Sequence, residues 1–256
     1  MERSKSDSIK IDNLTNDQWE NFKKKKIYFG HQSVGQNIID GMLTIRNNAY
    51  VTGFNIEKLS NKNQLNRNAL FHQFIGENYD PYSKINAFKN VINTKIGETV
   101  DIAFFKFCYV DIDANTNIQK LFEFYTTFMD TLINEYPNVT FIHTTIPLVS
   151  LKRNIKDWIK IIIGKNTIKN AEANIRRNEF NEMLRNKYDN KVPIFDIAKF
   201  ESTLPNGQRV FFINNEIEYE SMAPIYSNDG GHLNQLGRKV VANALLTLLS
   251  EVTGTN

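Results

Sequence analysis

Cysteine is nearly absent from this sequence, and long apolar runs are absent altogether. The 256 residues include one cysteine and four histidines. The single cysteine, Cys108, excludes an internal disulfide and any metal site built from several cysteines. The histidines lack the spacing of a zinc site, and no segment has the spacing of a calcium loop. We therefore expect no metal and no cofactor.

No stretch approaches the roughly 20 apolar residues that cross a bilayer, so we expect no membrane span. The first eight residues contain no apolar core, and no signal peptide is predicted. We expect a cytoplasmic chain as written, or an exported one if a further segment precedes it.

A strong charge of one sign is also missing. The formal net charge of +3 gives no reason to expect a nucleic-acid partner. Hydrophobic residues make up 41% of the chain and charged residues 23%, as in an ordinary soluble globular protein. The length suffices for one domain with a buried core. We expect an N-terminal extension over residues 1–25 and a single domain over residues 26–256, and leave the oligomeric state open.

Short apolar runs alternate with helical patterns along the chain. This alternation predicts βαβ units and an α/β fold with a central parallel sheet. The five expected strands lie at residues 27–30, 50–56, 101–107, 139–143 and 192–197. The expected helices lie at residues 34–47, 81–93, 118–135, 168–188 and 233–252.

Two segments depart from this alternation. Residues 150–165 mix basic and apolar side chains. This pattern fits a membrane-surface helix or an active-site lid, and it also fits an amphipathic helix packed on the sheet or on a partner chain. Residues 203–228 contain two turn signals around a short apolar run, which indicates a hairpin or an ordered loop.

Two fragments contain residue types used in nucleophilic catalysis. The first is a strand that runs into a turn, with Ser33 at its tip, and the second places Asp229 three residues before His232. A serine hydroxyl becomes a good nucleophile when a base takes its proton and a carboxylate orients that base. In a parallel sheet the ligand site lies at the carboxyl ends of the strands, where Ser33 is expected. Taken singly, Ser33 and Asp229 also fit the structural role of helix or turn caps.

The sequence resembles the SGNH (GDSL-type) hydrolase family in four blocks, in the family's order. They are residues 30–35 around the serine, Gly76, residues 108–111, and the Asp229/His232 pair. The resemblance implies a flavodoxin-like three-layer α/β/α sandwich with a five-stranded parallel sheet. It also implies a catalytic triad of Ser33, His232 and Asp229, with the N–H groups of Ser33 and Gly76 as the oxyanion hole. A Gly-x-Ser-x-Gly α/β-hydrolase fits less well, because the serine block is one residue too long for it.

Two departures from the family pattern concern the oxyanion hole. His31 and Gln32 stand where the family has one Asp before its serine, and Val110 stands where it has an oxyanion-binding Asn. The replacement donors or substrate contacts offered by the sequence are Lys106, Tyr109, Gln32 and His31. His143, at the end of the fourth expected strand, is a further candidate for the pocket rim.

The resemblance implies an esterase that removes small O-acyl groups, with O-acetyl on a carbohydrate as the expected substrate. The expected partner is thus a small-molecule or glycan acyl ester. One alternative is a polysaccharide O-acetyltransferase that uses the same triad. Another is a non-catalytic carbohydrate-binding protein on the same scaffold.

Overall fold

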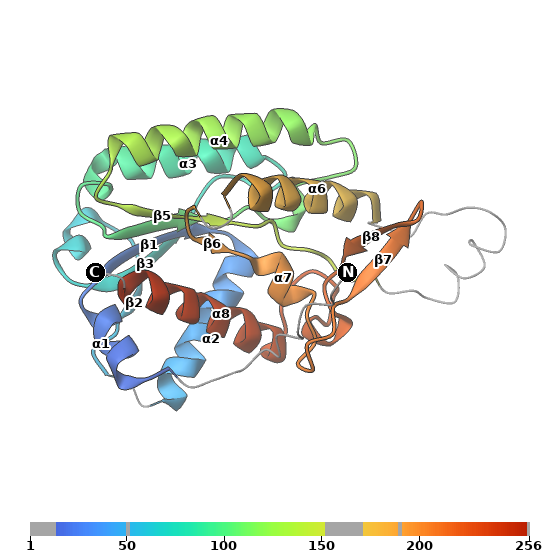
Figure 1. Ribbon diagram of the computed structural model, residues 1–256. Helices are drawn as coiled ribbons and strands as arrows, with labels where there is room; N and C mark the ends of the chain where they lie inside the picture. The colour runs from blue at the N-terminus through green and yellow to red at the C-terminus, as the bar shows by residue number, and fades with distance from the viewer. Residues whose placement is uncertain (1–13, 50–51, 152–170, 189–190, 255–256) are drawn as a thin grey trace.

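A six-stranded parallel sheet lies between two layers of helices (Figure 1). The computed structural model describes residues 14–49, 52–151, 171–188 and 191–254. The strand order is β2-β3-β1-β4-β5-β6, and every neighbouring pair is parallel. The strands are β1 (Lys26–His31), β2 (Ile56–Lys58), β3 (Ala69–Phe74), β4 (Ile102–Phe105), β5 (Thr140–Thr144) and β6 (Ile194–Phe195).

Side chains of alternate strand residues enter two separate cores, because successive residues of a strand point to opposite faces. In β1, Phe29 packs into one core and Tyr28 into the other. The Phe29 face is covered by α1 (Asn16–Lys23), α2 (Ser33–Asn48), α7 (Ile197–Glu201) and α8 (Gln235–Gly254) (Figure 1). The Tyr28 face is covered by α3 (Pro81–Val91), α4 (Ile118–Glu135) and α6 (Ala171–Tyr188).

The α/β class and the parallel sheet are as predicted, but the count of five strands is wrong. The missed strand is β3, where His72 and Gln73 interrupt the apolar run. His72 is nevertheless buried, because its ring bonds to the ring of His31 on the neighbouring strand. The strand expected at residues 50–56 is instead the short β2, which begins at Ile56.

Local capping chemistry explains the helix starts. The side chain of Asp80 accepts a hydrogen bond from Ser83 N, and Pro81 occupies the first turn of α3. Asn117 caps α4, which spans the predicted 118–135. The helix expected to 93 ends at Val91, where a π-helical turn, η2 (Ile92–Ile96), follows. Short 3₁₀ turns complete the fold: η1 (Lys62–Asn66), η3 (Tyr109–Asp111) and η4 (Pro224–Tyr226).

Part of the range 1–25 contributes to the core. Helix α1 packs on α8, and its Trp19 and Phe22 are buried against Phe54. The described part of this range is therefore packed against the rest of the fold.

The segment 203–228 contains the expected hairpin, formed by β7 (Phe211–Asn214) and β8 (Ile217–Glu220). Its turn residues Asn215 and Glu216 both have positive φ, as a two-residue type I′ hairpin turn requires. The segment 150–165 lies outside the described residues from 152 onward. No helix in the described part of the chain is long and apolar enough to cross a membrane.

Candidate active site

Ser33 is the first residue of α2 and is separated from the central strand β1 by one residue. β1 ends at His31, and Gln32 adopts an extended conformation before the helix begins. The hydroxyl therefore lies at the carboxyl end of the sheet, beside the free N–H groups of the first helical turn. Such N–H groups attract negative charge.

Gly35 is required by the ring of His31. A Cβ at Gly35 would lie 2.3 Å from His31 Cβ and 2.4 Å from its Cγ. The first turn of α2 can therefore pass over the histidine only with glycine at this position.

Asp229 organises the turn that carries His232. Its Oδ1 accepts hydrogen bonds from Gly231 N at 2.9 Å, from His232 N at 2.8 Å and from Ser227 Oγ at 3.1 Å. Gly230 has a φ of +92°, a conformation that favours glycine. Burial is the largest single effect on the Asp229 carboxyl and raises its pKa, but these hydrogen bonds and the one from the His232 side chain together outweigh it and hold the pKa well below its ordinary value.

The structure brings Ser33, His232 and Asp229 into one hydrogen-bonded row. His232 Nε2 lies 3.2 Å from Ser33 Oγ, and His232 Nδ1 lies 2.8 Å from Asp229 Oδ2. The His232 and Asp229 side chains are 43% and 57% exposed, so solvent reaches the row. This arrangement can take a proton from the serine hydroxyl and deliver it to a leaving group.

Two contacts fix the turn of His232, one to the helix of Ser33 and one to the segment after β5. Asn37, one turn along α2 from Ser33, accepts a hydrogen bond from Leu233 N at 3.1 Å. Gly230 O accepts one from Ser150 N at 2.8 Å.

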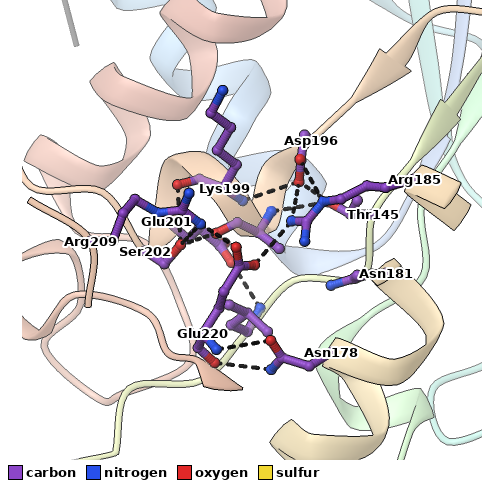
Figure 2. Close-up of polar contacts among 12 residues, drawn as sticks. Thr145, Asn178, Asn181, Arg185, Asp196, Lys199, Glu201, Ser202, Arg209 and Glu220 are labelled. Carbon is purple, nitrogen blue, oxygen red and sulfur yellow. Dashed lines mark hydrogen bonds and ion pairs between the residues drawn. The ribbon is translucent and has the colours of Figure 1, made fainter. Parts of the chain in front are cut away.

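An ion-pair network anchors the strand that leads to this turn. Figure 2 shows Glu220, the last residue of β8, between Arg185 of α6 and Arg209. Arg185 also pairs with Asp196 at 2.8 Å, and Asn178 bonds to the backbone of Glu220 at both its N–H and its carbonyl. The chain thus leaves β8 from a fixed position nine residues before Asp229.

Gly76 lies in the turn after β3 and contacts the serine block through Gln32. The Gln32 side-chain amide donates to Ile75 O at 3.0 Å and to Gly76 O at 2.9 Å. Gly76 has a φ of +59°, and a Cβ there would lie 2.6 Å from Lys84 N. Both the backbone conformation and the lack of space therefore require glycine.

Three of the four expected replacement donors are engaged within the protein. Both N–H donors of Gln32 are used by carbonyls of the Gly76 turn. The Lys106 ammonium is buried and donates to Phe107 O at 2.9 Å. The ring of His31 is buried between Gln32 O at 2.8 Å and His72 Nδ1 at 2.9 Å. Burial lowers the pKa of His31 to about 3, which keeps the ring neutral.

The fourth candidate, Tyr109, lies beside the row. Its ring meets the ring of His232 edge-on, with centroids 5.8 Å apart. Its hydroxyl lies against Gly231, where a Cβ would come within 2.6 Å of the oxygen. Tyr109 therefore forms a wall behind the imidazole of His232.

His143 does not lie with the other candidates. It is buried in β5, with Nδ1 2.8 Å from Tyr125 Oη and its ring stacked on Tyr188 at 3.8 Å. Burial lowers the pKa of His143 to about 4. A residue enclosed by the α4 and α6 layer has no path to the pocket rim, so the sequence-based placement of His143 was wrong.

The motifs did not identify Arg177 as part of the site. Its guanidinium donates to Tyr109 O at 2.9 Å and to Ile112 O at 3.0 Å, which fixes the turn after β4. The signal that could have found it is the spacing of Asn174, Arg177 and Asn181, polar residues on the face of α6 that packs inward. Polar side chains on a buried helix face need partners, and these bond to the loops at the sheet's carboxyl edge.

Tyr109 also lines a cleft of about 630 Å³. Its walls include the aromatic rings of Tyr79 and Tyr82 as well as Tyr109, with Asp113 and Asn117 among its polar lining residues. Tyr79 is 78% exposed at the rim. Among the described residues, no three His, Cys, Asp or Glu side chains converge as a metal site.

Comparison with known proteins gives a family match and several similar folds. A family model described as GDSL-like Lipase/Acylhydrolase matches residues 21–245. No curated protein matches the sequence.

Among solved structures, a protein from Streptococcus pneumonia assigned provisionally as a platelet activating factor has a TM-score of 0.52 and 13% identity, covering 91% of this chain and 90% of that chain. The periplasmic domain of a lipopolysaccharide acetyltransferase from Salmonella ser. Paratyphi A has a TM-score of 0.49 and 11% identity, covering 87% of this chain and 82% of that one. A lipolytic protein of the G-D-S-L family from Veillonella parvula has a TM-score of 0.45 and 14% identity, covering 86% of this chain and 95% of that one. At such identities the likeness concerns the fold alone.

Proposed function

The chain belongs to the GDSL-like lipase/acylhydrolase family, and from this premise we propose that it is a serine esterase that removes small O-acyl groups. The observation that carries the proposal is the row of hydrogen bonds from Ser33 Oγ through His232 to Asp229. The family contains hydrolases and acyltransferases, so the reaction class rests on the family and the residue roles rest on this geometry.

In the first step Ser33 Oγ attacks the acyl carbon of the ester while His232 Nε2 accepts the hydroxyl proton. The carbonyl oxygen becomes an oxyanion, and the N–H groups of Ser33 and Gly76 are its proposed donors. The intermediate collapses to an acyl-serine as His232 gives its proton to the leaving alcohol. Water then attacks the acyl carbon with His232 again as base, and the acid and free Ser33 are released.

Asp229 orients His232 and stabilises its charged form. The Nδ1–H of His232 donates to Asp229 Oδ2, which leaves Nε2 free to accept the serine proton. The hydrogen bonds from Gly231 and His232 keep the pKa of Asp229 low, so the carboxylate stays ionised while the imidazole cycles.

We propose O-acetyl groups on a carbohydrate as the substrate. The resemblance to the family supports this, and so does the aromatic cleft beside Tyr109, because aromatic rings present apolar faces to sugar rings. The exposure of His232 and Asp229 favours hydrolysis over transfer to a glycan hydroxyl, since a transferase must keep water from its acyl-enzyme. The intact hydrogen-bonded row argues against a purely binding role.

The test is hydrolysis of 4-nitrophenyl acetate and of an acetylated sugar by wild type, Ser33→Ala and His232→Ala. We expect each substitution to reduce kcat/KM by about 10³-fold or more with the fold retained by circular dichroism. Ser60→Ala replaces an exposed serine that follows β2, two strands away from β1, and is the matched control that should retain full activity. Wild-type rates in folded Ser33→Ala would overturn the proposal.

A further inference from the structure

A fully buried ion pair joins two turns of the site and has no part in the mechanism above. Lys84 Nζ lies 2.7 Å from Asp111 Oδ1, and neither side chain is exposed to solvent. Removing two charges from water is costly, and an apolar pair of similar volume is often as stable. Stability alone therefore does not account for the pair.

The ammonium of Lys84 is directed at the turn that contains Gly76. It donates to Glu77 O at 2.6 Å and to Asn78 Oδ1 at 3.5 Å, in addition to Asp111. An ammonium has three protons, and these three acceptors use all of them.

The carboxylate of Asp111 holds the same turn and a second one. Its Oδ1 accepts from Tyr79 N at 3.0 Å, and its Oδ2 accepts from Cys108 N at 2.7 Å. The pair thus ties the turn after β3 to the turn after β4.

These two turns lie on either side of the serine. β3 and β4 are the two neighbours of β1 in the sheet, and Ser33 follows β1. The Lys84–Asp111 bridge therefore joins the loops that follow the two neighbours of β1.

Gly76 cannot move independently of Lys84. The position of a Cβ on Gly76 is 2.6 Å from Lys84 N and 2.7 Å from its Cα, so the helix backbone lies directly against the glycine. On its other side, the Gly76 carbonyl is held by Gln32 at 2.9 Å.

We infer that Lys84 and Asp111 are positioning residues, and that their pair fixes the turn that presents the Gly76 N–H to the oxyanion. The inference rests on the proposed function, because it requires an acyl transfer at Ser33. Positioning acts on the transition state more than on substrate binding, so its loss should lower kcat and leave KM nearly unchanged.

The experiment compares Lys84→Met, Asp111→Asn and the double variant Lys84→Met/Asp111→Asn with wild type. The double variant leaves no unpaired buried charge, so it keeps the test open if a single variant fails to fold. The matched control is Lys187→Met, which removes a lysine that pairs with Asp130 at 3.0 Å on the surface.

Three quantities are measured on 4-nitrophenyl acetate. The burst of 4-nitrophenol counts the active sites, turnover gives kcat per active site and KM, and inhibition gives the Ki of phenylboronic acid, which mimics the tetrahedral intermediate. We expect kcat per active site to fall about 10- to 100-fold, KM to change little, and Ki to rise with the loss of kcat.

A merely structural role gives a different pattern. Fewer active sites with an unchanged kcat per site and an unchanged Ki would overturn the inference, as would a double variant with wild-type kcat. Failure of the proposed function is recognised separately, because folded Ser33→Ala would then turn over the ester as fast as wild type.

Discussion

The side-chain amide of Gln32 donates hydrogen bonds to the carbonyls of Ile75, at 3.0 Å, and Gly76, at 2.9 Å, and thereby ties the residue before the nucleophile to the turn after β3. The serine block is one residue longer than the family pattern, and Gln32 is part of that difference. This amide therefore links the loop of the proposed nucleophile, after β1, to the loop of the proposed oxyanion donor Gly76, after β3.

Gln32→Glu tests this link with a side chain of the same shape. A carboxylate facing two carbonyl oxygens loses both hydrogen bonds and adds repulsion, so the Gly76 turn should shift. We expect kcat/KM for an acetyl ester to fall about 10- to 100-fold at neutral pH, with most of the loss in kcat. Steady-state kinetics measure kcat and KM of both proteins, and thermal unfolding shows whether the variant is folded. An unchanged kcat in a folded Gln32→Glu variant would contradict this role.

Gly35→Ala should damage the site through sterics alone. Alanine is favoured over glycine inside a helix, but here its Cβ would overlap the ring of His31, whose Cγ would be 2.4 Å away. We expect a loss of stability of about 2 kcal/mol or more, together with a loss of activity. Gly254→Ala, near the end of α8 with no atom within 4 Å of its Cβ position, is the control and should leave both unchanged.

Denaturant unfolding of Gly35→Ala, Gly254→Ala and wild type gives the free energy of unfolding of each protein. A second check is the double variant Gly35→Ala/His31→Gly, which removes the Cβ that lies 2.3 Å from the new methyl group as well as the ring, and should recover part of the lost stability. Equal stability of Gly35→Ala and wild type would mean that His31 can move aside at no cost.

Much of the fold follows from local sequence signals. The helix Ile118–Glu135 has a continuous apolar face and is followed by Pro137, and both of its predicted boundaries are confirmed. The strand β3 was missed because its His72 is polar and is compatible with burial only through His31, 41 residues away. No local pattern contains that partner.

The same distinction holds for the site. Ser33, Asp229 and His232 could be predicted as a group because the proposed roles impose residue types and short spacings that a sequence displays, and the structure brings the three side chains together. Lys84 was not found, because a lysine on a helix ordinarily points to solvent, and only the tertiary fold encloses it with Asp111. The position of His143 was not predicted correctly. The end of a strand indicates that a residue lies near the carboxyl edge of the sheet, but not which helices cover its side chain.

The pH dependence of catalysis should show a single protonation on its acid side. The hydrogen bonds to Asp229 hold the pKa of its carboxyl well below its usual 3.8, so this group stays ionised as the pH falls. Asp229 therefore adds no second protonation, and a plot of log kcat/KM between about pH 4 and pH 8 should have a limiting slope no greater than one. A slope of two would mean that Asp229 titrates in the same range.

Asp229→Asn complements this profile. The amide cannot accept the Nδ1–H of His232 as a charged partner and favours the wrong tautomer, so kcat should fall about 10²- to 10⁴-fold. A folded Asp229→Asn variant with wild-type kcat would show that the carboxylate does not orient the base.

Glu201 should make the protein less stable as the pH rises. Burial raises the pKa of its carboxyl from 4.5 to about 8, although the N–H of Leu148 and the charges of Lys106 and Arg177 favour ionisation. The folded pKa lies above the unfolded one, so the stabilising contribution is complete below about pH 4.5 and is lost as the pH rises through 8.

Glu201→Gln removes this titration. We expect the free energy of unfolding of wild type, relative to the variant, to fall by roughly 2 to 4 kcal/mol between pH 5 and pH 8.5. Urea unfolding of both proteins at the two pH values gives the difference. A difference independent of pH would mean that Glu201 is already ionised in the folded protein at pH 5.

The most direct test of the account is to locate the acyl group on the enzyme during turnover. The protein is mixed with 4-nitrophenyl acetate, quenched in acid within milliseconds and digested, and the acetylated peptide is sequenced by tandem mass spectrometry. The account predicts acetyl on Ser33 in wild type, and none there in Ser33→Ala or at the same early time in His232→Ala. Acetyl on another residue such as Cys108, with turnover retained in Ser33→Ala, would contradict the assignment of Ser33 as the nucleophile.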